Sequence, residues 1–343
     1  MRSERVKTME EFAALSGISR PTLSKYFNDP NSVRPTTRKR VEAALERYHY
    51  TPNVYAINQN RQLTRNIGIV VPYLADPFFA EVARNLEPLC AQSSFNPILL
   101  SSHGDPDREI ENLENLRAIR PAGVLLAPLG RRSDREQVAA FCEEVPTVLF
   151  DCDIDAVGDA FFGSDNSQSI GVIVEYLART GEAPAFFEMR HAPNPNANKR
   201  RAAYEAAMHA LGQEPVILAV EGQGWNFEEI AFAEAERVLA TRVLPSSTIL
   251  CSNDRLAIGF LSAAYECGYR VGVGPGHSLR IAGHDDHPYA RFTCPSLTTV
   301  SQDYDSIAGQ SLDLLLSIIA TGDRPAKKSA TLFDGALAMR RSA

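Results

Sequence analysis

The amino-acid sequence predicts a small all-α head followed by a two-lobed α/β body that contains two doubly wound parallel sheets. Helix-type spacing of apolar residues fills the first 50 residues, and from residue 66 onward short apolar runs alternate with amphipathic segments in two successive series. Runs that are apolar throughout are typical of parallel strands buried on both faces. We therefore expect a head at 1–50, a connecting segment at 51–65 and a body at 66–343.

The head begins with a helix whose two ends are both marked in the sequence. Thr8 and Glu11 have the spacing of a capping box, in which each side chain bonds to the backbone N–H of the other residue. Met9 and Phe12 then follow helical spacing. Gly17 stands where a residue in the left-handed conformation commonly ends a helix.

Two further helices complete the head. The second is expected from Arg20 to Phe27, with Pro21 in its first turn, where the missing N–H is tolerated. The third opens at Pro35, and its apolar face consists of Val41, Ala44, Leu45 and Tyr48. Three short helices with a glycine turn between the first two have the geometry of a helix-turn-helix, whose second helix enters the major groove of DNA.

The charge distribution supports a nucleic-acid partner for the head. Residues 1–65 hold 12 Lys and Arg against 6 Asp and Glu, a net charge of +6, whereas the remainder holds 23 against 36, a net charge of −13. The candidate DNA-binding side chains of the second helix are those of Arg20, Thr22, Ser24, Lys25 and Asn28. Cations of the third helix are expected along the DNA backbone, namely Arg34, Arg38, Lys39 and Arg40. The alternative is a three-helix protein-interaction module.

The segment TMEEFAALSGISRPTLSKYFND and the later TTRKRVEAALERYHYTPN resemble the head of the lactose-repressor (LacI/GalR) family. The resemblance runs from about Thr8 to the end of the chain. It implies that Arg20, Pro21 and Lys25 occupy base-reading positions. Pro21 has no side-chain donor, so its contribution can only be apolar, such as a contact with a thymine methyl group.

The connecting segment TPNVYAINQNRQLTR is polar and weakly periodic, which alone indicates a flexible linker. In the family that it resembles, this stretch forms a short helix on DNA and wedges a leucine into the minor groove. The wedge position in this sequence is Gln59, which could instead hydrogen-bond the minor-groove edge; a linker that does not insert is the alternative. We count Asn53, Tyr55 and Gln59 among the candidate DNA-binding residues.

The body contains two series of alternating strands and helices. In the first, strands at 67–72, 97–101, 123–128 and 147–150 alternate with helices at 78–92, 106–119 and 133–143. In the second, strands at 185–188, 216–220, 248–252 and 279–283 alternate with helices at 198–211, 227–240 and 253–267. The family's sensor domain resembles type I periplasmic binding proteins, so we expect an N-lobe of about 66–165 and 298–325 and a C-lobe of about 166–297 and 326–343.

Candidate effector-binding residues stand at the predicted strand ends, where ligands bind in open α/β sheets. The resemblance supports the same positions. Polar candidates suited to hydroxyl groups are Asp76, Arg200, Asn253, Asp285 and Gln302. Aromatic candidates suited to a sugar face are Phe78, Phe79 and Trp225. Taken singly, the two phenylalanines could be ordinary core, Asn253 a helix cap and Trp225 a surface aromatic residue.

Two other clusters admit a structural and a functional interpretation. The run His284-Asp285-Asp286-His287 contains metal-ligand residue types, but adjacent residues on an extended strand point to opposite faces, so no metal site is expected. The loop 190–201 carries four cations, a histidine and three asparagines. It is either a solvated loop or the contact for a negatively charged effector, such as a sugar acid or sugar phosphate.

The sequence also argues against several classes of protein. No apolar run reaches the roughly 20 residues of a membrane span, and the start carries no secretory signal. Six cysteines are scattered without a CxxC pair, as expected for a cytoplasmic protein without a disulfide framework. No nucleophile elbow, P-loop or dinucleotide fingerprint follows a strand, so neither an enzyme nor a cofactor is expected.

We therefore expect a transcription regulator, a repressor, that binds pseudo-palindromic operator DNA and responds to a small carbohydrate-like effector. Because the C-terminal LFDGALAMRRSA carries no heptads that would add a tetramerising coil, a homodimer is expected. The competing interpretation is the solute-binding receptor of a sugar transporter, which would need a secretory signal and no helix-turn-helix.

Overall fold

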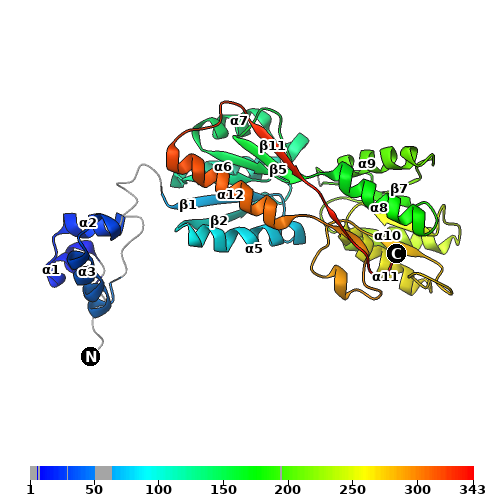
Figure 1. Ribbon diagram of the computed structural model, residues 1–343, viewed down its shortest axis with the longest axis horizontal. Helices are drawn as coiled ribbons and strands as arrows, with labels where there is room; N and C mark the ends of the chain where they lie inside the picture. The colour runs from blue at the N-terminus through cyan, green and yellow to red at the C-terminus, as the bar shows by residue number, and fades with distance from the viewer. Residues whose placement is uncertain (1–5, 7, 29, 51–63, 194) are drawn as a thin grey trace. The chain divides into compact units, whose positions relative to one another are not determined.

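The computed structural model describes residues 6, 8–28, 30–50, 64–193 and 195–343 (Figure 1). The chain divides into two compact units, Met1–Thr64 and Arg65–Ala343. Each unit is described by itself below. The first is all-α, and the second is an α/β body of two lobes, as the sequence predicts.

The head consists of α1 (Met9–Ser16), α2 (Arg20–Asn28) and α3 (Pro35–Tyr48), with a short 3₁₀ turn at Pro30–Ser32. The capping box at Thr8 and Glu11 is present in both directions. Gly17 ends α1 with φ 63° and ψ 24°, a left-handed conformation that glycine adopts at little cost. Arg34 stands at the N-cap of α3 without a side-chain cap bond, and Pro35 follows it at the helix start.

One small apolar cluster holds the head together. Its buried members come from all three helices and the turns: Phe12, Ile18, Leu23, Val41, Ala44 and Tyr50. Phe12 and Tyr50 stack with ring centroids 4.5 Å apart. Tyr48 donates a 2.9 Å hydrogen bond to the Leu15 carbonyl, which ties the end of α3 to α1. The apolar spacing that predicted the helices therefore also supplies their core.

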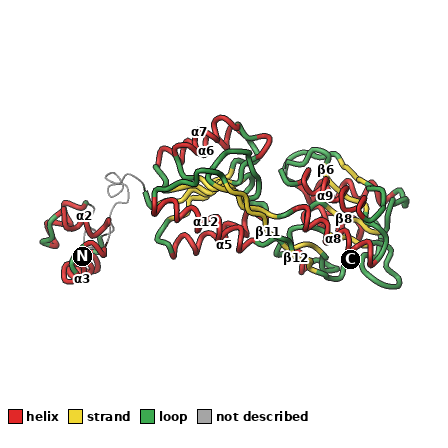
Figure 2. Tube along the Cα trace, turned by 45° about the horizontal axis from the view of Figure 1, so that its top comes forward, coloured by secondary structure: helices red, strands yellow, loops and turns green. Residues whose placement is uncertain are grey.

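The first lobe is built on a six-stranded sheet of order β11-β5-β4-β3-β1-β2, and all of its pairings are parallel. The strands are β1 (Asn66–Val71), β2 (Asn96–Ser101), β3 (Gly123–Leu126), β4 (Thr147–Phe150), β5 (Ala160–Ser164) and β11 (Ser329–Phe333). The helices are α5 (Pro77–Gln92), α6 (Pro106–Ile119), α7 (Arg135–Glu144) and α12 (Tyr304–Thr321). Figure 2 shows α6 and α7 on one face of the sheet and α5 and α12 on the other.

The second lobe has a four-stranded parallel sheet of order β7-β6-β8-β9. The strands are β6 (Ala185–Met189), β7 (Ile217–Val220), β8 (Thr248–Cys251) and β9 (Arg280–Ala282). The helices are α8 (Asn166–Thr180), α9 (Ala197–Ala210), α10 (Phe227–Ala240) and α11 (Asp254–Glu266). Two short strands, β10 (Thr299–Ser301) and β12 (Ala336–Ala338), pair with each other in antiparallel fashion beside this sheet.

The points at which the chain crosses between the lobes differ in part from the sequence-based expectation. The assignment of 326–343 to the second lobe is wrong at its start, because β11 pairs with β5 in the sheet of the first lobe. The chain leaves that lobe only after Phe333, and Figure 1 shows β11 running on toward β12. Residues 298–301 also lie with the second lobe, through bridges to Ala282 and Asp285. Six helices and strands of the body were not assigned from the sequence, namely β5, α8, β10, α12, β11 and β12.

None of the helices in the described part of the chain is both long and apolar enough to cross a membrane.

Candidate functional site

The exposed face of α2 carries the head's candidate DNA-binding side chains. Leu23 is buried in the head core, whereas Arg20, Pro21 and Lys25 are exposed and Thr22 and Ser24 are half-buried. Arg20 pairs with Glu10 at 2.8 Å, but both side chains stay more than half exposed, at 65% and 60%. Such a pair is weak in water and leaves the guanidinium available to a phosphate or a base. Asn28 ends α2 in the described backbone.

Two cations that were expected along the DNA backbone bond to the head itself. Arg40 donates a 2.8 Å hydrogen bond to the Gly17 carbonyl, and Arg38 donates one of 2.9 Å to the Pro30 carbonyl. Both bonds satisfy carbonyl groups of the turns on either side of α2. These arginines therefore position α2, whatever they contribute to DNA. The candidates Asn53, Tyr55 and Gln59 lie outside the described residues.

In the body, six of the eight candidate effector residues line one small cavity between the lobes. Asp76, Phe78 and Phe79 come from the start of α5 in the first lobe, and Arg200, Asn253 and Asp285 come from the second. Asp151, directly after β4, lines the same cavity and was missed by the sequence analysis. The cavity measures about 10 Å³, which is room for one water molecule at most.

Asp285 is the centre of the polar cluster. Its Oδ1 accepts hydrogen bonds from Arg200 Nη2 at 2.7 Å and from Gln302 Nε2 at 2.6 Å, and it lies 3.0 Å from His284 Nδ1. Gln302, the seventh candidate, thus joins the cluster through Asp285, and it also accepts a hydrogen bond from Ser164 of the first lobe. Burial raises the pKa of Asp285, but the Arg200 guanidinium, His284 and His287 together lower it by more, so the pKa stays well below its usual range.

Arg200, the ion-pair partner of Asp285, is also buried and makes several hydrogen bonds. It lies on α9 with 3% of its side chain exposed, and it donates to Asn166 Oδ1 at 3.1 Å and to the Ser252 carbonyl at 2.8 Å. A buried guanidinium needs such partners, because an unpaired buried charge is strongly destabilising. The cluster therefore fixes the positive and negative groups of the site before any ligand arrives.

Two aspartates that line the cavity, Asp151 and Asp285, have unusual backbone conformations. Asp151 has φ 62° and Asp285 has φ 122°, in the region that residues other than glycine rarely adopt. Such strain persists only where the surrounding structure enforces it, and it clusters at binding sites. Asn196 Nδ2 donates to Asp151 Oδ1 at 2.7 Å, and burial raises the pKa of Asp151 to about 7.

Two buried histidines, His284 and His287, lie beside Asp285. Burial, together with the charge of Arg200, lowers the pKa of His284 to about 4, and its Nε2 lies 2.9 Å from Ser169 Oγ. His287 Nε2 lies 3.4 Å from Asp285 Oδ2. Among the residues that the structure describes, no group of three or more His, Cys, Asp or Glu side chains is arranged to hold a metal ion.

An ion pair crosses between the lobes at the edge of the same cavity. Asp76 caps α5 by accepting from the Phe78 N–H at 3.0 Å, and its other oxygen lies 3.1 Å from Arg255 Nη1 of α11. Arg255 also holds Glu228 through two hydrogen bonds of 2.7 Å. The sequence analysis missed Arg255, because nothing local in SNDRLAIG relates it to a residue 179 positions away.

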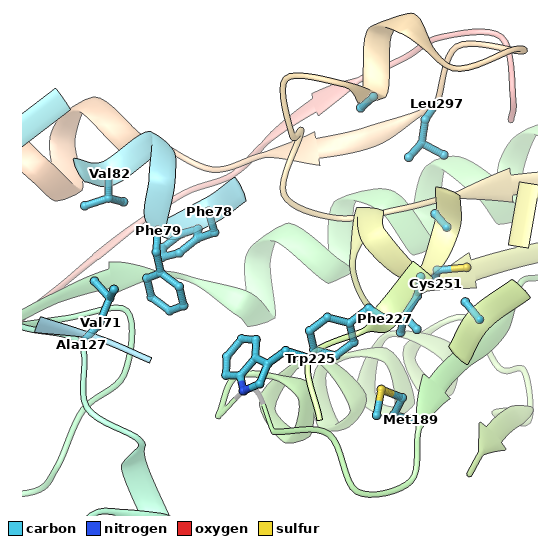
Figure 3. Packing of buried hydrophobic residues seen from close by; sticks show 14 of the residues in the cluster. Val71, Phe78, Phe79, Val82, Ala127, Met189, Trp225, Phe227, Cys251 and Leu297 are labelled. Atoms are coloured by element: carbon cyan, nitrogen blue, oxygen red, sulfur yellow. The ribbon is translucent and has the colours of Figure 1, made fainter. Parts of the chain in front are cut away.

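Aromatic rings from both lobes meet beside these charges. Figure 3 shows Phe78 and Phe79 on one side and Trp225 and Phe227 on the other. The rings of Phe79 and Trp225 have centroids 6.5 Å apart, and Trp225 stacks on Tyr73 of the first lobe at 5.3 Å. Trp225 is 7% exposed, so it is not a surface aromatic residue. Gly104 permits this placement, since a Cβ there would lie 2.6 Å from the indole nitrogen.

Asn253, the remaining candidate, has a structural role whatever its functional one. Its side-chain oxygen accepts from the Leu256 N–H at 2.8 Å and so caps α11. The cap orients the residue at the carboxyl end of β8, against the cavity. The eight candidates and Asp151 thus form one connected neighbourhood between the lobes.

Two protein-family models match this chain, one in the head and one in the body. Residues 8–53 match the bacterial regulatory proteins of the lacI family, and residues 169–343 match the periplasmic binding protein-like domain. The ribose operon repressor of Escherichia coli (strain K12) is 28% identical over 312 residues, covering 90% of this chain and 92% of the relative.

Solved structures share the fold. The Lac repressor dimer bound to operator and the anti-inducer ONPF has a TM-score of 0.83 at 23% identity, with 98% of each chain covered. A LacI family transcriptional regulator from Enterococcus faecium with bound ribose has a TM-score of 0.67 at 17% identity, covering 81% of this chain and 98% of that one. The family consists of regulators rather than enzymes, and a transporter's receptor would not carry the matched head. The chain therefore belongs to the LacI family of bacterial regulatory proteins, and it is a DNA-binding transcription regulator under the control of a small-molecule effector.

Proposed function

We propose that this protein is a repressor that acts as a homodimer in the cytoplasm, and that a small carbohydrate-like effector bound between the two lobes changes its affinity for operator DNA. The proposal is carried by one observation. Carboxylate, amide and guanidinium groups from both lobes converge on the same small cavity beside a set of aromatic rings. This combination suits a compact ligand that has many hydroxyl groups and apolar C–H faces.

The DNA side of the proposal rests on α2. Its outward face presents Arg20, Pro21, Thr22, Ser24 and Lys25, while Leu23 anchors the helix in the head core. Arginine and lysine donate to the major-groove edge of guanine, and hydroxyl groups suit phosphates. Two heads related by a two-fold axis would read a pseudo-palindromic site, with Asn28, Asn53, Tyr55 and Gln59 as further proposed contacts. The Lac repressor structure with operator is likewise a dimer.

The effector side requires movement of the lobes. A cavity of about 10 Å³ cannot hold a monosaccharide, so the lobes must separate to admit the ligand and then close on it. Asp76, Asp151, Phe78 and Phe79 would contact the ligand from the first lobe, and Arg200, Trp225, Asn253 and Asp285 from the second, with Gln302 holding Asp285. The Enterococcus faecium relative was solved with bound ribose, which is a compact ligand of the proposed kind.

Control of DNA binding then follows from a population shift. An effector that binds one arrangement of the lobes more tightly than the other changes the balance between them. Because each lobe arrangement sets a different spacing of the two heads in a dimer, operator affinity changes with it. The proposal therefore predicts that effector and operator affinities depend on each other.

The test is binding of the full-length protein to its own upstream DNA, at two salt concentrations, with and without a panel of sugars and sugar acids. We expect saturable binding to a short palindrome that weakens with salt and is altered by one compound of the panel. Weak binding that is indifferent to sequence, under conditions where the body still binds a sugar, would overturn the role of the head. The Lys25→Gln variant tests the head directly, because it removes a candidate DNA contact outside the head core and should weaken operator binding.

A further inference from the structure

The outer part of the cleft between the lobes contains two adjoining cavities rich in cationic side chains. The larger measures about 810 Å³ and is lined by His103, Arg132, Arg190, His191 and Trp225, among others. The smaller measures about 200 Å³ and is lined by Arg131, Arg132 and Lys199. The two share the lining residues Arg132, Ala192, Pro193 and Asn198, so they adjoin each other and are together called the outer space. The volume of the larger cavity is that of a small-molecule site.

The positive charges of this space are not all neutralised by the protein. Arg190 pairs with Glu221 at 2.6 Å, and Asp153, the acidic residue of the smaller cavity, pairs with Lys328. Within the part of the chain that the structure describes, no carboxylate forms an ion pair with Arg131, Arg132 or Lys199. Lys199 instead lies over the Phe161 ring, 5.8 Å from its centroid. The space therefore holds an excess of positive charge.

This outer space is adjacent to the deep cluster that is proposed to bind the effector's hydroxyl groups. Lys199 lines the outer space, and the next residue, Arg200, reaches Asp285 in the deep cavity. Cys152 lines the outer space, and the residue before it, Asp151, lines the deep one. One small ligand could thus place a hydroxyl-bearing part in the deep cavity and another group among the outer cations.

We propose that the effector carries a carboxylate or phosphate group, and that Arg132 of the first lobe and Lys199 of the second bind this group at the outer end of the cleft. The inference rests on the proposed function, because it assigns the charge of the ligand at that same site. Guanidinium and ammonium groups form strong charge-assisted hydrogen bonds with such oxygens. The first turn of α9, which contains Lys199 and no acidic residue, adds the positive end of a helix.

An anion at this position also favours closure. Arg131 and Arg132 precede α7 in the first lobe, and Lys199 lies on α9 in the second, so the two lobes present like charges to the same cavity. Like charges in a shared cleft repel each other. A bound carboxylate or phosphate replaces that repulsion with attraction to both sides, so the ligand's charge contributes to the lobe movement that changes operator affinity.

The test compares matched pairs of neutral and charged ligands on the full-length protein. The panel consists of ribose with ribose 5-phosphate, glucose with glucuronate and glucose 6-phosphate, and inorganic phosphate alone. Affinity is measured by calorimetry and by fluorescence of Trp225, which is the single tryptophan of the chain and lines the outer cavity. The variants are Arg132→Gln and Lys199→Gln. Arg108→Gln is the control, an exposed arginine of the first lobe outside both cavities.

We expect one charged compound to bind at least about tenfold more tightly than its neutral parent, a difference of about 1.4 kcal/mol. Arg132→Gln and Lys199→Gln should each remove most of this preference, while Arg108→Gln keeps it. Glucuronate and the phosphates then distinguish a carboxylate site from a phosphate site. Because the mutated side chains are exposed, the variants should fold like the parent protein.

Two results would overturn the inference. One is a neutral sugar that binds as tightly as its charged derivatives. The other is failure of every anion, inorganic phosphate included, to bind in a manner that depends on Arg132 and Lys199. The proposed function is judged separately by operator binding, since a neutral sugar that alters operator affinity would uphold it while excluding an anionic effector.

Discussion

In the head, the candidate functional residues and the residues that stabilise the fold are different sets. In the cleft, they are the same residues. In the head, the candidate DNA contacts are exposed, with 65% of the Arg20 side chain in water, and a separate set led by Phe12, Leu23 and Val41 forms the core. In the cleft, the candidate contacts are themselves the buried structure, since Arg200 and Asp285 are 3% and 6% exposed.

This difference predicts two kinds of mutational response. A DNA-reading residue of the head can be replaced with little effect on folding, because it leaves no buried group unpaired. A polar residue of the cleft cannot, because its partner would remain buried with an unsatisfied charge. Loss of effector response through a cleft variant should therefore often be accompanied by loss of stability, whereas loss of operator binding through an α2 variant should not.

The largest effect is expected for Asp285→Asn. It removes the negative partner of the buried Arg200, so the free energy of unfolding should fall by about 3–5 kcal/mol. Urea denaturation measures this fall. The control is Arg190→Gln, which breaks an ion pair whose side chains are 53% and 69% exposed and should cost less than about 0.5 kcal/mol. Equal losses in the two variants would contradict the division between exposed and buried pairs.

A smaller loss, about 1–3 kcal/mol, is expected for Arg255→Met, because it leaves the buried Asp76 without its partner from the other lobe. Since this pair joins the lobes, the variant should also favour the open arrangement. Small-angle X-ray scattering should then show a larger radius of gyration. Glu228→Gln is the control, because Glu228 holds Arg255 within one lobe. An unchanged radius in Arg255→Met would show that the pair does not restrain the lobes.

A pH-dependent effect is expected from Asp151. Burial raises its pKa from 3.8 to about 7, so between these values the unfolded chain releases the proton and the folded protein keeps it. The contribution of Asp151 to stability therefore declines as pH rises through this window, by up to about 4 kcal/mol. Asp151→Asn keeps an oxygen for Asn196 and removes the decline. In urea denaturation from pH 4 to pH 8, the free energy of unfolding of the variant should increase relative to that of the parent protein as pH rises. A difference in free energy that stays constant with pH would refute this account.

The smallest effect on stability is expected in the head. Arg20→Gln and Lys25→Gln should change the free energy of unfolding by less than about 0.5 kcal/mol. Each should nevertheless weaken operator binding by about 1–3 kcal/mol and reduce its salt dependence if the contact is to phosphate. Fluorescence anisotropy with labelled operator DNA measures the affinity. A variant with lowered stability and unchanged affinity would reverse the proposed contrast between head and cleft.

The features that sequence analysis predicts well are those with a local cause. The capping box at Thr8 and Glu11, the left-handed Gly17 and the apolar face of α3 each follow from residues within one helix, and the structure contains all of them. In the cleft, the rule that ligand residues follow parallel strands, together with the family resemblance, placed Asp76, Arg200 and Asn253 around one cavity. The same rule applied to Asp151, directly after TVLF, would have found it as well.

The features that the sequence did not reveal depend on distant segments. β11 is an edge strand that carries exposed residues, and it joins the first sheet only by pairing with β5, more than 160 positions earlier. The approach of Arg255 to Asp76 likewise arises only when two lobes meet. Arg38 and Arg40 show the converse case, because their charge predicted contact with DNA while their geometry binds them to turns of the head.

The central claim, that effector and operator are coupled through the body, is tested most directly by measuring both sides of the linkage. Operator affinity is measured with and without the effector that the panel identifies, and effector affinity is measured by Trp225 fluorescence with and without operator. The account predicts that the two affinities change by the same factor, because the coupling free energy is shared. An effector that binds the cleft with the same affinity in the presence and absence of operator would contradict it.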